Sequence, residues 1–376
     1  MSAGAVMKLS KSWSTTILVA VLASAAAHGA DVGAAANVIE HYGLEQADAP
    51  VRERAGWRKP KRILVAGRIP QLAERVKAVM PDVEVVTADG PADAAQKAAN
   101  IDVVIGLCSP EILDAGKSIQ WIQILGAGVE QCVRIPAVRE RDILVTNMQR
   151  IGGPIIAEHV MALTLAFTRG LDIYIPAQAK REWRRATPPG RMTVVDGKTM
   201  LVVGLGGIGG EVAKRAHALG MRVIATRASG RTGPDYVSYV GLPDELPKLA
   251  SEADFVVNAA PLTPQTTGIF DAAFFAKMKP SAYFINVARG GSVVTAALVD
   301  ALNQKKIAGA GLDVTAPEPL PPEHPLWSAP NVIITPHVAN DSDLGYHAQV
   351  AVIEENLRRY ASGERMLSVV DVARGY

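Results

Sequence analysis

The chain has 376 residues, of which 49% are hydrophobic, and it carries 39 basic residues against 37 acidic ones. This length exceeds the size at which a single hydrophobic core keeps growing, so we expect two domains. A formal net charge of +2 provides no broad positive field, which argues against nucleic acid as a partner.

The two cysteines, Cys108 and Cys132, lie in no pattern that is typical of a metal site, so the sequence gives no support to metal catalysis. Both could sit on neighbouring loops at strand ends, which would allow a disulfide in an oxidising compartment. We favour two free, partly buried thiols as the interpretation.

Residues 1–30 have the three-part pattern of a signal peptide. Lys8 and Lys11 precede the apolar run TTILVAVLASAAA, and small residues follow through Ala30. The run is shorter than the roughly 20 residues of a comfortable membrane span, so we expect no stable span. Export to the periplasm is the favoured location, with a cytoplasmic protein that carries an N-terminal extension as the alternative.

Residues 31–60 mix alanine, charge and Gly/Pro punctuation, and we expect a linker or arm there. From Lys61, apolar runs alternate with spacers of helical length, a pattern that predicts parallel strands with helices on both faces of the sheet. The predicted strands of this first unit lie in RILVAG, VEVVTA, IDVVIGL, IQWIQILGAG and ILVTN. A predicted helix over 154–169 leads to a second unit.

The second unit opens on a glycine loop in an informative context. GLGGIG (204–209) follows an apolar run at 200–203 and precedes a predicted helix at 210–219 and a strand at 222–226. A lone GxGxxG is weak, but one between a strand and a helix predicts a dinucleotide-binding domain.

Each loop position has a physical role in that prediction. Gly204 permits the tight turn, Gly206 lets the backbone approach a pyrophosphate, and Gly209 allows the helix to pack closely on the strand. Gly207 and Ile208 complete the loop, where amides of the helix N-terminus bind phosphates.

The segment ATRASGR (225–231) bears on which cofactor is used. An NAD enzyme usually has Asp or Glu after the second strand, and this chain has none there. Arg227, Ser229 and Arg231 could instead hold a 2′-phosphate, so we expect NADP to be preferred over NAD. Ordinary surface charges are the alternative interpretation.

Three later motifs each place a charged side chain at the end of a predicted strand. They are YFINVARGG with Arg289, GAGLDVTAPEP with Glu318, and NVIITPHVA with His337. Any one of them alone would be read as a surface group. Together, after a dinucleotide loop, they supply a cation for a carboxylate and carbonyl, and an acid/base imidazole with a carboxylate partner. This set predicts a hydride-transfer enzyme.

From about residue 61 to 370 the chain resembles the D-isomer-specific 2-hydroxyacid dehydrogenases, in particular glyoxylate/hydroxypyruvate reductases. The resemblance rests on GLGGIG, ADFVVNAAPLTPQT, FINVARGG, GLDVTAPEPLPPEHPLW and NVIITPHVA, in that order. It implies an α/β fold of two doubly wound parallel-sheet, Rossmann-like domains with the active site in the cleft between them. Residues 61–150, completed by 337–376, would form the substrate domain, and 151–336 the dinucleotide-binding domain.

The resemblance also implies roles for individual residues. Arg289 would bind the substrate carboxylate and polarise its carbonyl, His337 would be the acid/base, and Glu318 its partner. Backbone amides near Ala127 and Gly128 would hold the carboxylate. Pro261, Ala288 and Asp313 would contact the cofactor, Asp313 through the nicotinamide amide.

The reaction expected is transfer of a hydride between NADP or NAD and a small 2-keto or 2-hydroxy acid, such as glyoxylate or hydroxypyruvate. A formate dehydrogenase is less favoured, because those enzymes typically have Gln where this chain has Glu318, and formate needs no proton. A nicotinamide-sensing, corepressor-like binding protein is the alternative from another class, since fold alone does not separate it.

The sequence leaves the particular acid open. The loops that would decide it, 107–110 and 126–132, show no distinctive charge in our interpretation. The resemblance implies a homodimer through the second domain, and for residues 179–191 an interface arm and an exposed basic loop both stay open. His159, in the predicted linking helix, is expected to have a structural role.

Overall fold

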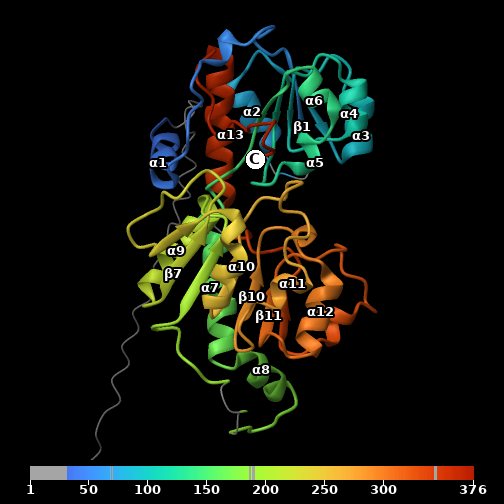
Figure 1. The fold of residues 1–376 in the computed structure, drawn as a ribbon. Helices are drawn as coiled ribbons and strands as arrows, with labels where there is room; N and C mark the ends of the chain where they lie inside the picture. Colours follow the sequence, from blue (N-terminus) through green and yellow to red (C-terminus); the bar gives the residue numbers. More distant parts are fainter. Residues whose placement is uncertain (1–31, 68, 70, 186–187, 189–190, 343–344) are drawn as a thin grey trace, which may run out of the picture.

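The computed structural model describes residues 32–376 except for 68, 70, 186–187, 189–190 and 343–344. The predicted signal peptide lies outside the described residues. The chain forms two α/β domains, one above the other in Figure 1, and each is built on a fully parallel sheet.

The sheet of the first domain has five strands in the order β2-β1-β3-β4-β5, and each strand lies within a predicted apolar run. The strands are β1 (Arg62–Ala66), β2 (Glu84–Ala88), β3 (Val103–Ile105), β4 (Trp121–Gln123) and β5 (Leu144–Thr146). One face is covered by α3 (Pro91–Lys97), α4 (Pro110–Ala115), α5 (Glu130–Val133) and α6 (Pro136–Glu140). The other is covered by α2 (Leu72–Val79) and by α13 (Gly345–Ser362), which returns from the second domain.

The segment expected to be a linker or arm packs on the first domain. Its helix α1 (Val32–Tyr42) lies beside α13, and the 3-10 turn η1 (Val51–Glu53) follows. Leu44 and Val51 are buried in the core of this domain, and the Trp57 indole donates to the Tyr360 carbonyl at 3.2 Å. The segment is therefore a packed arm rather than a free linker.

The sheet of the second domain has seven parallel strands in the order β12-β11-β10-β9-β6-β7-β8. They are β6 (Thr199–Val203), β7 (Arg222–Thr226), β8 (Tyr239–Gly241), β9 (Phe255–Asn258), β10 (Tyr283–Asn286), β11 (Gly309–Leu312) and β12 (Val332–Ile334). Helices α7 (Gly153–Thr168) and α9 (Gly207–Ala218) cover one face. Helices α10 (Leu246–Glu252), α11 (Ala272–Phe275) and α12 (Thr295–Asn303) cover the other. Helix α8 (Leu171–Ala179) and the 3-10 turns η2 (Pro243–Glu245), η3 (Gly290–Ser292) and η4 (Pro325–Ser328) lie in the connections.

Both sheets reverse their strand order next to their first strand. In the first domain the reversal lies between β1 and β3, and in the second between β6 and β9. In open α/β sheets, ligands bind outside the carboxyl ends of the strands at such points. Helices on both faces of two parallel sheets confirm the predicted fold class.

The expectation of two free thiols is wrong, because Cys108 and Cys132 form a disulfide. Cys108 follows β3, and Cys132 lies on α5 after β4. Because neighbouring parallel strands end at the same edge of a sheet, these two loops approach each other, and the two Cα atoms are 5.6 Å apart.

In the described part of the chain, no single helix is long and apolar enough to cross a membrane. The pair α7 and α8 meets the length and composition criteria only together, with a bend of 76° between them.

Candidate active site

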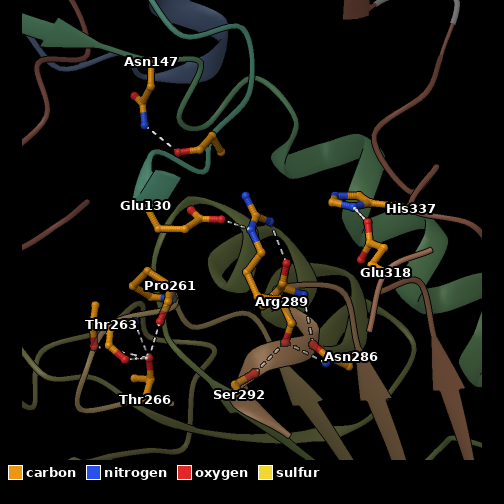
Figure 2. Close-up of polar contacts among 12 residues, drawn as sticks. Glu130, Asn147, Pro261, Thr263, Thr266, Asn286, Arg289, Ser292, Glu318 and His337 are labelled. Atoms are coloured by element: carbon orange, nitrogen blue, oxygen red, sulfur yellow. Dashed lines mark hydrogen bonds and ion pairs between the residues drawn. The ribbon is translucent and has the colours of Figure 1, made fainter. Parts of the chain in front are cut away.

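A cleft of about 740 Å³ lies between the two domains, and both contribute to its walls. Gly128 comes from the first domain, and Arg289, Glu318 and His337 come from the second. The three charged residues singled out in the sequence thus share one cavity. Figure 2 shows Arg289 lying between Glu130 and the pair formed by His337 and Glu318.

His337 and Glu318 lie together as predicted, and their acid/base role stays a prediction. The Nδ1 atom of His337 lies 2.5 Å from Oε1 of Glu318, and both side chains are partly exposed to the cleft. Since Nδ1 is engaged, Nε2 is the ring nitrogen left to exchange a proton with a ligand. His337 itself has a φ of +56°, a left-handed conformation that non-glycine residues adopt only when their surroundings enforce it.

The buried carboxylate of Asp313 supports that conformation. Its oxygens accept hydrogen bonds from the Thr335 hydroxyl at 2.6 Å and from the amides of Val338 and Ala339, both at 3.0 Å. The Nε2 atom of His159 lies 3.0 Å from the Thr335 hydroxyl, a contact that suits the structural role expected of this histidine. Asp313 therefore braces the loop that carries His337, and its contact with a nicotinamide amide stays a prediction.

Arg289 is held at three points. Its Nε donates to Glu130 Oε1 at 2.5 Å, and its Nη1 donates to the Ala288 carbonyl at 2.7 Å. Its own carbonyl accepts from Asn286 at 3.0 Å and from the Ser292 hydroxyl at 2.7 Å. These anchors aim the guanidinium across the cleft at the first domain.

The loop after β4 meets Arg289 directly. A Cβ at Gly128 would lie 1.5 Å from Nη2 of Arg289, so only glycine permits this approach. The neighbouring Ala127 carbonyl accepts from the Asn147 amide at 2.7 Å, which holds the loop in place. The structure thus brings the predicted carboxylate-binding loop and the predicted arginine together.

The glycine loop lies at the carboxyl end of β6. Gly204 has a φ of +93°, and a Cβ on it would lie 2.7 Å from the Ala260 Cα. At Gly209 a Cβ would lie 2.0 Å from the Gly204 carbonyl oxygen, so the close helix packing requires glycine. A Cβ at Gly206 would meet nothing within 4 Å, which leaves the space that a pyrophosphate needs.

Helix α9 begins at Gly207, three residues earlier than predicted, so the amides of Gly207 and Ile208 belong to its first turn. Pro261 lies on the loop that follows β9, and its carbonyl accepts from the Thr266 hydroxyl at 2.6 Å. The open space beside Gly206, at this helix N-terminus, fits a dinucleotide.

The three residues expected to select NADP differ in their surroundings. Arg231 pairs with Glu245 at 2.6 Å, and hydrogen bonds from Tyr239, the Leu242 amide and Arg231 lower the pKa of Glu245 to about 2. Arg227 instead donates to the Ser229 hydroxyl at 2.7 Å and has no carboxylate partner among the described residues. The free positive charge at this end of β7 therefore belongs to Arg227.

The expectation that the loops at 107–110 and 126–132 lack a distinctive charge is wrong, because Glu130 reaches into the cleft. Sequence reasoning passed over this residue. The available signal was an acidic side chain directly after the GAGV turn at a strand end.

Comparison with known proteins agrees with this geometry. Residues 161–339 match the family model described as D-isomer specific 2-hydroxyacid dehydrogenase, NAD binding domain. Glyoxylate/hydroxypyruvate reductase A of Photorhabdus laumondii is 33% identical over 273 residues, which cover 71% of this chain and 84% of that protein. The chain belongs to the D-isomer specific 2-hydroxyacid dehydrogenases.

A solved structure of this family has the same fold. The NADPH-dependent glyoxylate/hydroxypyruvate reductase of Sinorhizobium meliloti, in complex with NADP and sulfate, aligns with a TM-score of 0.73 at 31% identity. The alignment covers 84% of this chain and all of that one. D-3-phosphoglycerate dehydrogenase of Methanocaldococcus jannaschii is 31% identical over 83% of this chain but only 59% of its own length.

As a D-2-hydroxyacid dehydrogenase, the protein is an NAD(P)-dependent oxidoreductase that acts on CH–OH groups. Within residues 32–376, outside the gaps named above, no group of three or more His, Cys, Asp or Glu side chains could hold a metal ion.

Proposed function

We propose that this dehydrogenase reduces a small 2-keto acid, such as glyoxylate or hydroxypyruvate, with NADPH as its preferred cofactor. The observation that carries the proposal is the convergence of Arg289, the His337–Glu318 pair and the Gly128 loop on one cleft. The names of the Photorhabdus and Sinorhizobium relatives support the same substrates.

The cofactor would supply the hydride, and the side chains of the cleft would bind the substrate and supply the proton. The carbonyl oxygen of the substrate needs a proton, which Nε2 of His337 can donate. Glu318 engages Nδ1 and so fixes the orientation of the ring, which leaves Nε2 for this exchange. Arg289 stays cationic and offers Nη2 towards Gly128, where the substrate carboxylate and carbonyl would lie.

The preference for NADPH rests on Arg227. An unpaired guanidinium at the end of β7, with no acidic residue in ATRASGR, suits a 2′-phosphate and not two ribose hydroxyls. Arg231 is less suited to this role, because Glu245 matches its charge.

The test is oxidation of NADPH and of NADH by the purified protein with glyoxylate, hydroxypyruvate, pyruvate and phenylpyruvate. We expect turnover with NADPH, and a loss of at least about 100-fold in kcat for His337→Ala with unchanged cofactor binding. Cofactor binding without turnover would favour the corepressor-like sensor. Formate-dependent cofactor reduction that exceeds all keto-acid activity would favour a formate dehydrogenase.

We also propose export to the periplasm. The signal-like pattern of residues 1–30 and the Cys108–Cys132 disulfide both suit an oxidising compartment. Mass spectrometry of the protein from fractionated cells should find a periplasmic form that lacks about 30 N-terminal residues. An intact chain in the cytoplasmic fraction would contradict export.

A homodimer is the third proposal. Apolar side chains are exposed along α7, α8 and the segment that follows, namely Leu165, Leu171, Ile175, Trp183, Met192 and Val194. Several exposed apolar side chains on neighbouring segments of the chain favour a protein interface there.

A further inference from the structure

Two pairs of opposite charge lie in the cleft. Arg289 is paired with Glu130, and His337 with Glu318. The other charged side chains that line the cleft are Asp89 and Arg134, both exposed and of opposite sign. Arg134 has no ion-pair partner among the described residues, but it is exposed, and solvent screens its charge. The cation beside Gly128 is Arg289, and Glu130 already pairs with it.

The carboxylate of Glu130 lies where it can affect the charge of the substrate that binds. Its side chain is 17% exposed, and its Oε2 lies 2.9 Å from where a Cβ of Gly128 would be. The carboxylate thus lies against the loop expected to hold the substrate carboxylate. It is also held in place, because Cys132 on the same short helix is tied to the loop after β3.

We propose that Glu130 is a specificity-determining residue, which restricts the enzyme to 2-keto acids that carry one carboxylate and an uncharged remainder. The inference rests on the proposed function and narrows it. A substrate with one carboxylate can share Arg289 with Glu130. A second carboxylate or a phosphate would add negative charge beside Glu130 in a partly desolvated cleft, where like charges repel more strongly than in water.

Two groups of relatives differ, by their names, in the charge of their substrates. The glyoxylate/hydroxypyruvate reductases act, by their name, on acids with an uncharged remainder, whereas D-3-phosphoglycerate dehydrogenase acts on a phosphorylated acid. Under this inference, we expect the substrates of this enzyme to resemble those of the first group.

The test compares hydroxypyruvate with 3-phosphohydroxypyruvate, and glyoxylate with oxaloacetate, as substrates for the wild type, Glu130→Gln and Glu140→Gln. Glutamine keeps an oxygen that can accept from Arg289 but removes the charge. Glu140 is an exposed residue of α6 outside the cleft, so its variant controls for the change in net charge. The ratio of kcat/KM between the multiply charged acid and the monoanion is read within each preparation, which cancels differences in active fraction.

We expect the wild type to favour the monoanions, and Glu130→Gln to raise the ratio of multiply charged acid to monoanion about tenfold, with Glu140→Gln unchanged. An unchanged ratio in Glu130→Gln, or a wild type that prefers the multiply charged acids, would overturn the inference.

A binding measurement separates this inference from the proposed function. Oxamate and oxalate are unreactive analogues of similar shape that carry one and two negative charges, and their Kd values can be measured by calorimetry on the protein with NADPH. Glu130→Gln should improve oxalate binding relative to oxamate about tenfold, even if no keto acid is turned over. An equal change for both analogues would count against Glu130, whereas absence of turnover with a shifted ratio would count only against the proposed reaction.

Discussion

At the scale of single residues, Arg227 and Arg231 are the two candidates for binding the 2′-phosphate of NADPH. Arg227 and Arg231 lie four positions apart, yet only Arg231 has a carboxylate partner, Glu245. A charge that is already matched adds little to the binding of a new anion, so the discrimination between NADPH and NADH should depend on Arg227.

We therefore predict that Arg227→Ala raises KM for NADPH by about 10- to 100-fold, which corresponds to the loss of one or two hydrogen bonds to a charged group. KM for NADH should change little, because NADH lacks the 2′-phosphate. The control is Arg222→Ala, which removes an exposed arginine paired with Glu252 at the other end of β7. Equal effects of Arg227→Ala on both cofactors would contradict this role.

Among the elements, helix α13 contacts both the sheet and the N-terminal arm of the first domain. Tyr360 on this helix stacks on Trp121 of β4 with ring centroids 4.9 Å apart, and its backbone carbonyl accepts from Trp57 of the N-terminal arm. The pKa of the Tyr360 hydroxyl is raised from 10.0 to about 12, and burial is the main cause. The folded state thus favours the neutral phenol.

The sign of the resulting pH dependence follows from linkage. The contribution of Tyr360 is fully present below pH 10, because both states are protonated there, and it is lost as pH rises from 10 towards 12, where only the unfolded state ionises. We predict that urea unfolding shows the wild type losing about 2 kcal/mol more than Tyr360→Phe across this range. Parallel pH curves for the two proteins would refute the assignment.

On the scale of the whole molecule, apolar side chains of the second domain are exposed to solvent on α8 and in the segment after it. Trp183 is 94% exposed in the segment after α8, and Ile175 on α8 is 60% exposed. In Figure 1 α8 lies at the end of the second domain that is remote from the first, so an interface there would leave the cleft open.

We predict that Trp183→Ala lowers the sedimentation coefficient from that of a dimer towards that of a monomer, because aromatic anchors dominate interface energies. Trp327→Ala is the matched control, since Trp327 is also exposed but lies on η4. An unchanged sedimentation coefficient for Trp183→Ala would argue for an exposed basic loop instead of an arm at the interface.

The sequence by itself determined the strands of the first sheet, those of the second except β8 and β9, the glycine loop and the trio of Arg289, Glu318 and His337. These features depend on local periodicity and on which residue follows a strand, and in parallel sheets such residues converge at one edge. Tertiary structure alone decided that Glu130 pairs with Arg289, that Cys108 and Cys132 are bonded, and that residues 32–60 pack on the first domain. Glu130 and Arg289 are 159 positions apart and lie on different domains, so only the way the two domains meet could bring them together.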